Sequence, residues 1–267
     1  MVGGRTHWVL TSNFGGREFV YKLWRPTQQS RAMREAAIHG YLIDCGVRCP
    51  VAERASDISP LQTVRFRGED WLAFVTRRVR CSPPSLCAFE DLGGQLATLH
   101  AAPVAGLPHL PTVTFESVFA TIPPEIVAYL QTRLRRSVAE LATGARLGRL
   151  TISHGDATLE NVVLDGPRAW LTDFEHLRFA PAGLDVGRVL FSIGARRPTL
   201  VKALISGYDR EEPSSSDFDL WSAIVCAGLE VASWRLANSD HAPLGGWKAA
   251  VDELSAWWSR SMLNLRV

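Results

Sequence analysis

Apolar and polar residues alternate over two stretches near the start of the chain, in the pattern typical of antiparallel β-strands. Residues 7–24 (HWVLTSNFGGREFVYKLW) predict a hairpin with a tight, glycine-containing turn, and Pro26 ends it. Residues 61–80 (LQTVRFRGEDWLAFVTRRVR) predict a second hairpin that turns at residues 68–70. The two hairpins together indicate a small antiparallel sheet.

A helix is predicted between the two hairpins, over QQSRAMREAAIHGYLIDCG (residues 28–46). Its apolar stripe is expected to consist of Met33, Ala37, Tyr41 and Leu42, and its end is expected at Gly46. One helix packed on a small sheet would account for the first part of the chain.

The pattern changes at CSPPSLC (residues 81–87), a proline-rich break at which we place the hinge between two lobes. Residues 1–80 would form the small lobe, and residues 88–267 a larger, mostly helical lobe. Helical spacing predicts helices at 88–101, 123–144, 184–195, 198–208, 217–238 and 245–262. A strand-rich lobe followed by a helical lobe is an α+β arrangement.

One further hairpin is predicted inside the helical part, and polar residues surround it. NVVL and AWLTDF flank the turn sequence DGPR, so residues 161–174 should pair as two antiparallel strands. Asn161 begins one strand and Asp173 ends its partner, which sets the two residues side by side. Asp156 lies in the loop just before Asn161 and can face the same space. Three oxygen-bearing side chains therefore converge.

These three side chains suit phosphoryl transfer with a bound metal ion. Asp and Asn oxygens are hard ligands that fit Mg²⁺. We expect Asn161 and Asp173 to bind Mg²⁺, and Asp156 to orient or deprotonate a hydroxyl group. Any one of these residues alone would be an ordinary turn or cap residue. The joint pattern, HGDxxxxN followed by a strand and an Asp-Phe-acid sequence, is what predicts a nucleotide–Mg²⁺ site.

The same residues carry a family resemblance. HGDATLEN (154–161) followed by LTDFEH (171–176) resembles the aminoglycoside phosphotransferase and choline-kinase-type family, which has the protein-kinase-like fold. The helix that ends in LATLHA before a long insert also matches the layout of that family. The resemblance covers most of the chain and is strongest over residues 150–190. It implies a bilobal kinase-like fold, ATP or GTP with Mg²⁺, and an acceptor that bears a hydroxyl group.

The resemblance also assigns roles near the hairpin. GLDVGR (183–188) resembles the downstream aspartate segment of the family, which makes Asp185 a brace for the catalytic loop. His154 is expected to order that loop rather than to transfer protons. Glu175 could help a second metal site or could face solvent. Backbone groups at residues 76–79 are expected to receive the adenine.

In the small lobe, a kinase-like site requires a lysine on a central strand, paired with a glutamate on the adjoining helix. Lys22 and Glu35 fit this requirement, and Lys22 is one of only three lysines among 29 basic residues. A solvent-facing Lys22 is the alternative. GGRTHWVL (3–10) resembles the glycine-containing phosphate loop, so the backbone N–H groups of Gly3 and Gly4 are expected to approach phosphate oxygens.

The small lobe departs from the family in one respect. The first strand, which should precede the phosphate loop, is missing, because only Met1 and Val2 lie upstream. A late start codon, a trimmed lobe, or a partner protein that covers the open sheet edge would each explain this departure. It motivates a competing hypothesis, a non-catalytic or partner-activated kinase-like binding protein. The complete set of catalytic residues opposes that hypothesis.

The sequence leaves the acceptor open. Substrate choice should come from the insert at 103–150 and from the helices after residue 190. The acids in YDREEPSSSDFD (208–219) could line a pocket for a polycationic aminoglycoside, or could be solvated residues that cap the next helix. The acceptors considered are an antibiotic, a sugar, a nucleoside-like metabolite, and Ser or Thr of a ribosomally made peptide.

Composition narrows the remaining classes of protein. The chain has 267 residues and a formal net charge of +2, which gives no basis for nucleic-acid binding and mildly disfavours a cationic substrate. Five cysteines without a CxxC pair indicate a reducing compartment rather than a disulfide framework. No apolar run is long enough to cross a membrane. We therefore expect a cytoplasmic protein without membrane contact.

Overall fold

A computed structural model describes residues 2–3, 8–53, 60–105, 107, 109–114, 128–129, 148–193, 197–211, 220–237, 252 and 256. The strands of its large sheet are β1 (Val2–Gly3), β2 (Trp8–Phe14), β3 (Arg17–Trp24), β4 (Leu61–Phe66) and β5 (Glu69–Arg77). The longer helices are α1 (Gln29–Asp44), α2 (Leu86–Ala101), α6 (Ala182–Ile193), α7 (Pro198–Glu211) and α8 (Leu220–Ala237).

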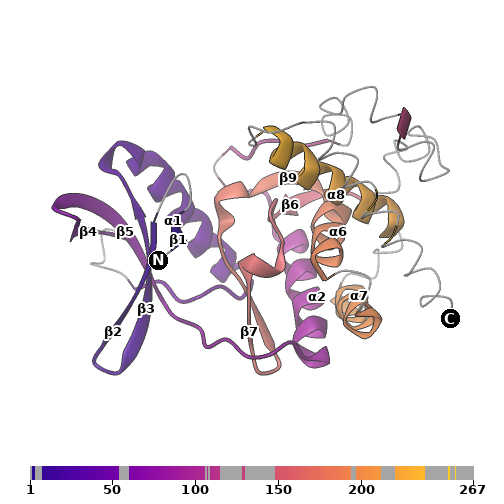
Figure 1. Cartoon of the computed structure of the whole chain (residues 1–267), viewed down its shortest axis with the longest axis horizontal. Coiled ribbons are helices and arrows are strands. Elements are labelled where there is room, and N and C mark those ends of the chain that lie inside the picture. The colour runs from indigo at the N-terminus through magenta and orange to yellow at the C-terminus, as the bar shows by residue number, and fades with distance from the viewer. Residues whose placement is uncertain are drawn as a thin grey trace.

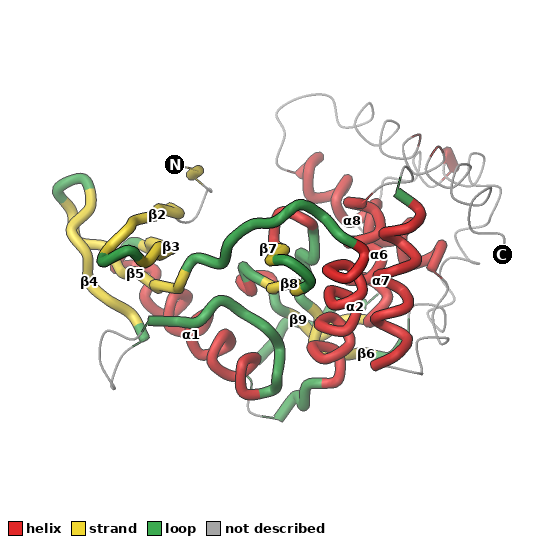
Figure 2. The backbone as a smooth tube through the Cα atoms, turned by 90° about the horizontal axis from the view of Figure 1, so that it is seen from below, coloured by secondary structure: helices red, strands yellow, loops and turns green. Residues whose placement is uncertain are grey.

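These elements separate into two parts. The large sheet and α1 lie on one side of the molecule, and α2, α6, α7 and α8 lie on the other (Figure 1). The segment after β5 runs as an extended loop to α2 (Figure 2). The predicted α+β class is confirmed, and the hinge at residues 81–87 stays a prediction.

The large sheet is antiparallel and has the order β1-β2-β3-β5-β4. Strand β3 pairs with β2 on one side and β5 on the other, so Lys22 lies opposite both Val9 and Phe74. The first predicted hairpin is confirmed. Gly15 and Gly16 form its turn with φ of 61° and 77°, a left-handed conformation that glycine adopts without steric cost.

The second predicted hairpin is also confirmed, with its turn at Arg67–Gly68, slightly earlier than predicted. The expectation of a missing first strand needs a correction. Val2 and Gly3 pair with Val9 and Trp8, so β1 is present as two residues. Gly3 ends this strand and its phosphate contact stays a prediction, whereas Gly4 lies outside the described residues.

Helix α1 is rotated relative to the predicted apolar stripe. Its buried residues are Ala32, Glu35, Ala36, Ile38, His39 and Leu42. The predicted stripe is wrong at Met33, which is 40% exposed, and at Ala37, which is exposed, whereas Leu42 is buried and Tyr41 packs, partly buried, against the core. The helix instead turns Glu35 inward, toward the sheet, where it meets Lys22. The buried face of α1 therefore combines apolar residues with a polar contact to the sheet.

The hairpin predicted inside the helical part is confirmed as β7 (Val162–Asp165) paired with β8 (Arg168–Leu171). A second pair, β6 (Leu150–Ser153) with β9 (Arg178–Pro181), brackets the same segment. The loop that contains Asp156 runs from β6 to the hairpin, and the segment with Asp173 runs from the hairpin to β9. Two short strand pairs therefore fix both ends of the polar segment.

The helices pack closely around this segment. α2 begins at Leu86, and the Ser85 Oγ accepts a hydrogen bond from the Ala88 N–H at the helix start. A Cβ atom at Gly93 of α2 would lie 2.0 Å from the Leu204 carbonyl oxygen of α7, so only glycine permits this approach. α6, α7 and α8 correspond to three predicted helices, whereas those predicted at 123–144 and 245–262 lie almost wholly outside the described residues. None of the described helices is long and apolar enough to cross a membrane.

Candidate active site

Lys22 and Glu35 form a buried ion pair between the sheet and α1. The Lys22 Nζ donates hydrogen bonds to the Glu35 Oε1 at 2.8 Å and Oε2 at 2.9 Å. Burial acts to lower the pKa of Lys22, but the attraction of Glu35 and then of Asp173 outweighs it and raises the pKa above its ordinary value. Lys22 is therefore a charged residue inside the molecule, which excludes the solvent-facing alternative.

Lys22 also reaches Asp173, with 2.6 Å between the Nζ and the Asp173 Oδ1. Asp173 precedes the short 3-10 helix η4 (Phe174–His176) and has φ 63° and ψ 67°. Few residues other than glycine adopt this left-handed conformation, and Asp and Asn tolerate it best. Backbone held in such a conformation is concentrated at functional sites.

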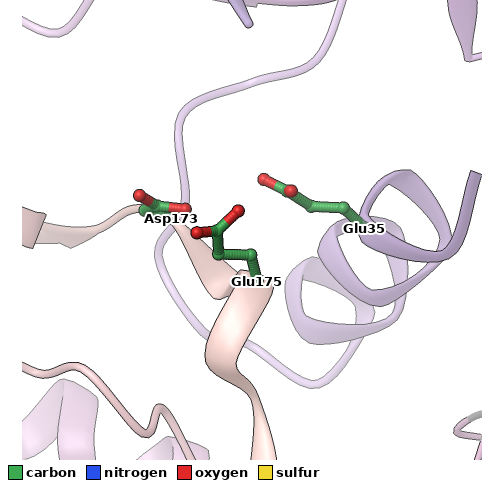
Figure 3. Close-up of side chains that lie close together, drawn as sticks. All are labelled: Glu35, Asp173 and Glu175. Carbon is green, nitrogen blue, oxygen red and sulfur yellow. The ribbon is translucent and has the colours of Figure 1, made fainter. Parts of the chain in front are cut away.

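Glu35, Asp173 and Glu175 approach one another from two sides (Figure 3). Glu35 extends from α1, and the other two come from the segment after β8. One carboxylate oxygen of each lies within 4.8 Å of the others. Glu175 is also 3.7 Å from the Lys22 Nζ and 3.3 Å from the Arg31 Nη2, and its side chain is only 10% exposed. Of the two options for Glu175, the solvent-facing one is therefore wrong.

Asn161 lies beside Thr172 and close to Asp173 at the base of the β7–β8 hairpin. The Asn161 carbonyl oxygen accepts hydrogen bonds from the Thr172 N–H (3.0 Å) and Oγ1 (3.1 Å). The Asn161 Nδ2 donates to the backbone oxygen (2.9 Å) and Oδ2 (2.8 Å) of Asp156, which leaves its Oδ1 as an acceptor. This amide oxygen and the Asp173 carboxylate are hard ligands that fit Mg²⁺, so the two residues could hold that ion.

The carboxylate of Asp156 is contacted at both oxygens. Asn161 binds its Oδ2, and the Nη2 of Arg188, on α6, lies 2.9 Å from its Oδ1. The Asp156 side chain remains 29% exposed, so a ligand can still reach it. Asp156 is thus held in one orientation at the edge of the site.

Asp185, in the first turn of α6, is fully buried and binds the loop that leads to Asp156. Its carboxylate accepts hydrogen bonds from the Ser153 Oγ (2.9 Å) and from the backbone N–H groups of His154 (2.6 Å) and Gly155 (3.0 Å). Burial opposes its charge, but the hydrogen bond and attraction of His100, followed by His154, hold the pKa of Asp185 well below its usual range. These contacts to three consecutive residues agree with the predicted role of Asp185 in holding this loop.

Both ring nitrogens of His154 bind backbone groups. The Nε2 lies 2.9 Å from the Thr172 carbonyl oxygen, and the Nδ1 lies 3.3 Å from the Asp156 backbone nitrogen. A carbonyl only accepts and an amide N–H only donates, so Nε2 carries the proton and Nδ1 accepts. Burial lowers the pKa of His154 against the pull of Asp185. A neutral ring fixed in this way orders the loop and has no nitrogen left to transfer a proton.

Gly155, between His154 and Asp156, is required by both space and conformation. Its φ is +77°, and a Cβ atom would lie 2.1 Å from the His176 carbonyl oxygen. Any side chain here would separate the Asp156 loop from η4.

Four aromatic rings form a column that connects the two parts of the chain. Ring centroids are 5.0 Å apart for His154 and Phe174, 6.1 Å for Phe174 and His39, and 5.0 Å for His39 and Phe74. Burial lowers the pKa of His39 to about 4, so this histidine is neutral at physiological pH. The column links the Asp156 loop to β5 through η4 and α1.

A cavity of about 570 Å³ lies between the sheet and the helical part. Its polar lining includes Lys22, Glu35, Asn161 and Asp173, and residues 76–79, predicted to receive the adenine, line it as well. Its apolar lining includes Val9, Val20, Phe74, Leu159, Val162, Val163 and Phe174. Asp156 lies outside this lining. The volume is that of a typical small-molecule or cofactor pocket.

Arg188 and Glu230 lie at this site and were not predicted from the sequence. The Arg188 Nη1 lies 3.0 Å from the Glu230 Oε2, and the Nη2 of Arg178 lies 2.8 Å from the same oxygen. Arg188 follows Asp185 by three residues on α6, a spacing that puts both on one helix face and could have identified it. Glu230 lies on α8, and no local pattern connects it to the site.

Solved structures share the fold of this chain over nearly its whole length. A spectinomycin phosphotransferase, in complex with ADP and spectinomycin, has a TM-score of 0.59 and 13% identity, covering 97% of this chain and 92% of that one. A choline/ethanolamine kinase family protein from Mesorhizobium loti has a TM-score of 0.62 and 17% identity, covering 99% and 91%. The microcompartment-associated aminopropanol kinase has a TM-score of 0.62 and 17% identity, covering 97% and 93%. The predicted kinase-like fold is confirmed.

The chain belongs to the phosphotransferase enzyme family, which its residues 2–218 match. A comparison with curated proteins gave no match. Family membership confirms the resemblance seen in the sequence. It also confirms the predicted enzyme class, a phosphotransferase with an alcohol group as acceptor.

Proposed function

We propose that the protein transfers the γ-phosphoryl group of ATP, bound with Mg²⁺, to a hydroxyl group of a small molecule. The observation that carries this proposal is the contact of Lys22 with both Glu35 and Asp173, beside a cavity of about 570 Å³. A cationic side chain, oxygen ligands that suit a metal ion and a cavity large enough for a nucleotide thus lie next to one another, as phosphoryl transfer requires.

In this proposal the nucleotide occupies the cavity, with its adenine along residues 76–79 and its phosphates toward Lys22. Lys22 binds the α- and β-phosphates, and Glu35 holds Lys22 in place. Asn161 and Asp173 hold Mg²⁺, which when bound neutralises charge on the phosphate oxygens. ATP as the donor is supported by similar folds: ADP is in the spectinomycin phosphotransferase complex, and AMP-PNP with Ca²⁺ is in an amicoumacin kinase complex.

Asp156 orients the acceptor hydroxyl and takes its proton as the new oxygen–phosphorus bond forms. It lies outside the cavity lining, yet Asn161 donates a hydrogen bond to it, so it lies next to a residue proposed to hold Mg²⁺. Phosphoryl transfer proceeds through a loose transition state, for which placement of the hydroxyl matters more than strong basicity. His154 and Asp185 hold the loop that carries Asp156.

For the acceptor, we propose a small hydroxyl compound, such as an antibiotic, a sugar or a nucleoside-like metabolite. Similar folds act on small molecules by name, among them spectinomycin and aminopropanol. Next to Asp156, Arg178 and Arg188 offset the charges of Asp156 and Glu230. The charges of these four residues balance, so they supply no excess of acids for a polycationic aminoglycoside.

The test is ATP–Mg²⁺ binding and ADP formation by the full chain. ATP–Mg²⁺ should raise the melting temperature, because it binds the folded form only. ADP formation should increase with at least one member of a panel of aminoglycosides, other antibiotics, sugars, nucleosides and Ser/Thr peptides, and mass spectrometry should show a phosphorylated product. No thermal shift and no ADP with any of them would contradict the proposal. A response only with an added partner protein would support the binding-protein alternative.

A further inference from the structure

We propose that Arg188 is a positioning residue for the reaction and sets the carboxylate of Asp156 in place from helix α6. This proposal rests on the proposed function, because Arg188 has this task only if Asp156 receives the acceptor hydroxyl. It adds to the site a residue on a separate element, outside the motif that contains Asp156.

The first observation is that local structure fixes only one oxygen of Asp156. Asn161, in the same loop segment, binds Oδ2 at 2.8 Å. The last torsion of an aspartate side chain is broad, so a carboxylate held at one oxygen can still rotate. The Nη2 of Arg188 binds the other oxygen, Oδ1, at 2.9 Å from a separate helix. Two contacts from two elements fix the plane of the carboxylate.

The second observation is that α6 holds the Asp156 loop in two ways. Asp185 accepts hydrogen bonds from the backbone N–H groups of His154 and Gly155. Arg188, three residues further along, binds the side chain of the next loop residue, Asp156. Residues three apart in a helix share a face. One helix face therefore positions both the backbone and the reactive carboxylate of the loop.

The third observation is that Arg188 is itself held in place. Its Nη1 lies 3.0 Å from the Glu230 Oε2, and Glu230 also binds Arg178 of β9. The Arg188 side chain is only 12% exposed. A planar guanidinium can bind two carboxylates at fixed angles, which the single ammonium group of a lysine cannot reproduce. Through Glu230, Arg188 therefore connects Asp156 to helix α8 and strand β9 as well as to its own helix, α6.

An ion pair of this kind could instead contribute only to stability, and the two roles predict different kinetics. If Arg188 acts through Asp156, its removal reduces turnover only while Asp156 is present. If Arg188 serves stability alone, its removal has the same effect on either background. A double-mutant cycle on turnover separates the two roles.

The experiment measures ADP formation from ATP–Mg²⁺ with water as the acceptor, so that no acceptor needs to be known. It uses the unaltered chain, Arg188→Met, Asp156→Asn and the double variant. Arg188→Met should lower turnover by roughly 100-fold, the size expected for a reacting group displaced by about 1 Å. Its ATP–Mg²⁺ affinity, measured by calorimetry, should not change, because Arg188 lies outside the cavity lining. In the Asp156→Asn background it should cause no further loss.

The matched control is Arg65→Met. Arg65 also pairs with a carboxylate, that of Asp70 at 3.2 Å, but the pair is exposed and far from the site. This variant should keep full turnover. Arg188→Lys covers the case in which Arg188→Met does not fold. Its single ammonium group cannot serve both acids, so turnover should fall to an intermediate value.

Wild-type turnover in Arg188→Met or in a folded Arg188→Lys would overturn the inference. So would an equal loss caused by Arg188→Met with and without Asp156. Failure of the proposed function has a different signature, because the unaltered chain would then neither bind ATP–Mg²⁺ nor form ADP.

Discussion

Lys22 and Asp173 are 151 positions apart in the sequence, yet the Nζ of one lies 2.6 Å from the Oδ1 of the other. Lys22 belongs to a central strand of the sheet and Asp173 to the turn after β8, so their contact joins the two parts of the chain beside the cavity. It also occupies the carboxylate that is proposed to hold Mg²⁺. Binding of ATP–Mg²⁺ would therefore replace this ion pair with contacts to phosphate and metal.

Lys22→Met should weaken both ATP binding and the fold. The substitution removes the cation that compensates the buried Glu35, and loss of one partner of a buried ion pair costs about 3–5 kcal/mol. Urea unfolding and calorimetry with ATP–Mg²⁺ measure the two effects. Lys202→Met is the control, because Lys202 is exposed on α7. Unchanged stability and affinity in Lys22→Met would contradict the role assigned to this pair.

Asp173→Asn should remove the Mg²⁺ dependence of ATP binding while it keeps the fold. Asparagine tolerates the left-handed backbone at this position, whereas alanine would add strain of about 1–2 kcal/mol, so Asn is the cleaner substitution. The measurement is the dissociation constant for ATP with and without Mg²⁺. We expect a large difference for the unaltered chain and little difference for the variant. An undiminished Mg²⁺ effect would show that Asp173 does not hold the ion.

His39 should make stability depend on pH between about 4 and 6.5. The ordinary pKa of histidine is 6.5, and burial lowers the pKa of His39 in the folded chain to about 4. As pH falls through this window, the unfolded chain binds a proton that the folded chain does not, so the free energy of unfolding decreases. The full effect is about 3 kcal/mol at the acidic end.

His39→Phe keeps an aromatic ring next to Phe74 and Phe174 but cannot titrate. Urea unfolding across this pH range should therefore give a flatter profile for the variant than for the unaltered chain. Part of the slope should remain, because burial lowers the pKa of His154 too. Parallel profiles would exclude His39 as a source of the pH dependence.

Features set by local sequence were predictable. The glycine turn at Gly15–Gly16 and the turn sequence after Asp165 each specify a hairpin, and both hairpins are present. The second of them places Asn161 near Asp173 without any long-range contact. The pairing of Lys22 with Glu35 required the family resemblance, because strand β3 and helix α1 do not fix their mutual orientation by themselves.

Features set by packing between distant elements were not predictable. The spacing of apolar residues places Met33 on the buried face of α1, but Met33 is exposed and the buried face contains Glu35, paired with Lys22. Glu230 reaches the site because α8 packs against α6, a contact with no signature in the local pattern. The sequence predicts no strand before the phosphate loop, whereas Val2 and Gly3 pair with β2.

The central claim, that Asp156 serves the acceptor side of an ATP–Mg²⁺ phosphotransferase, is tested most directly by Asp156→Asn. Calorimetry with ATP–Mg²⁺ and ADP formation are measured on the same preparation of the variant and of the unaltered chain. We predict unchanged nucleotide affinity, because Asp156 lies outside the cavity lining, and turnover lowered by roughly 10²–10⁴-fold. Undiminished turnover in Asp156→Asn would contradict the claim.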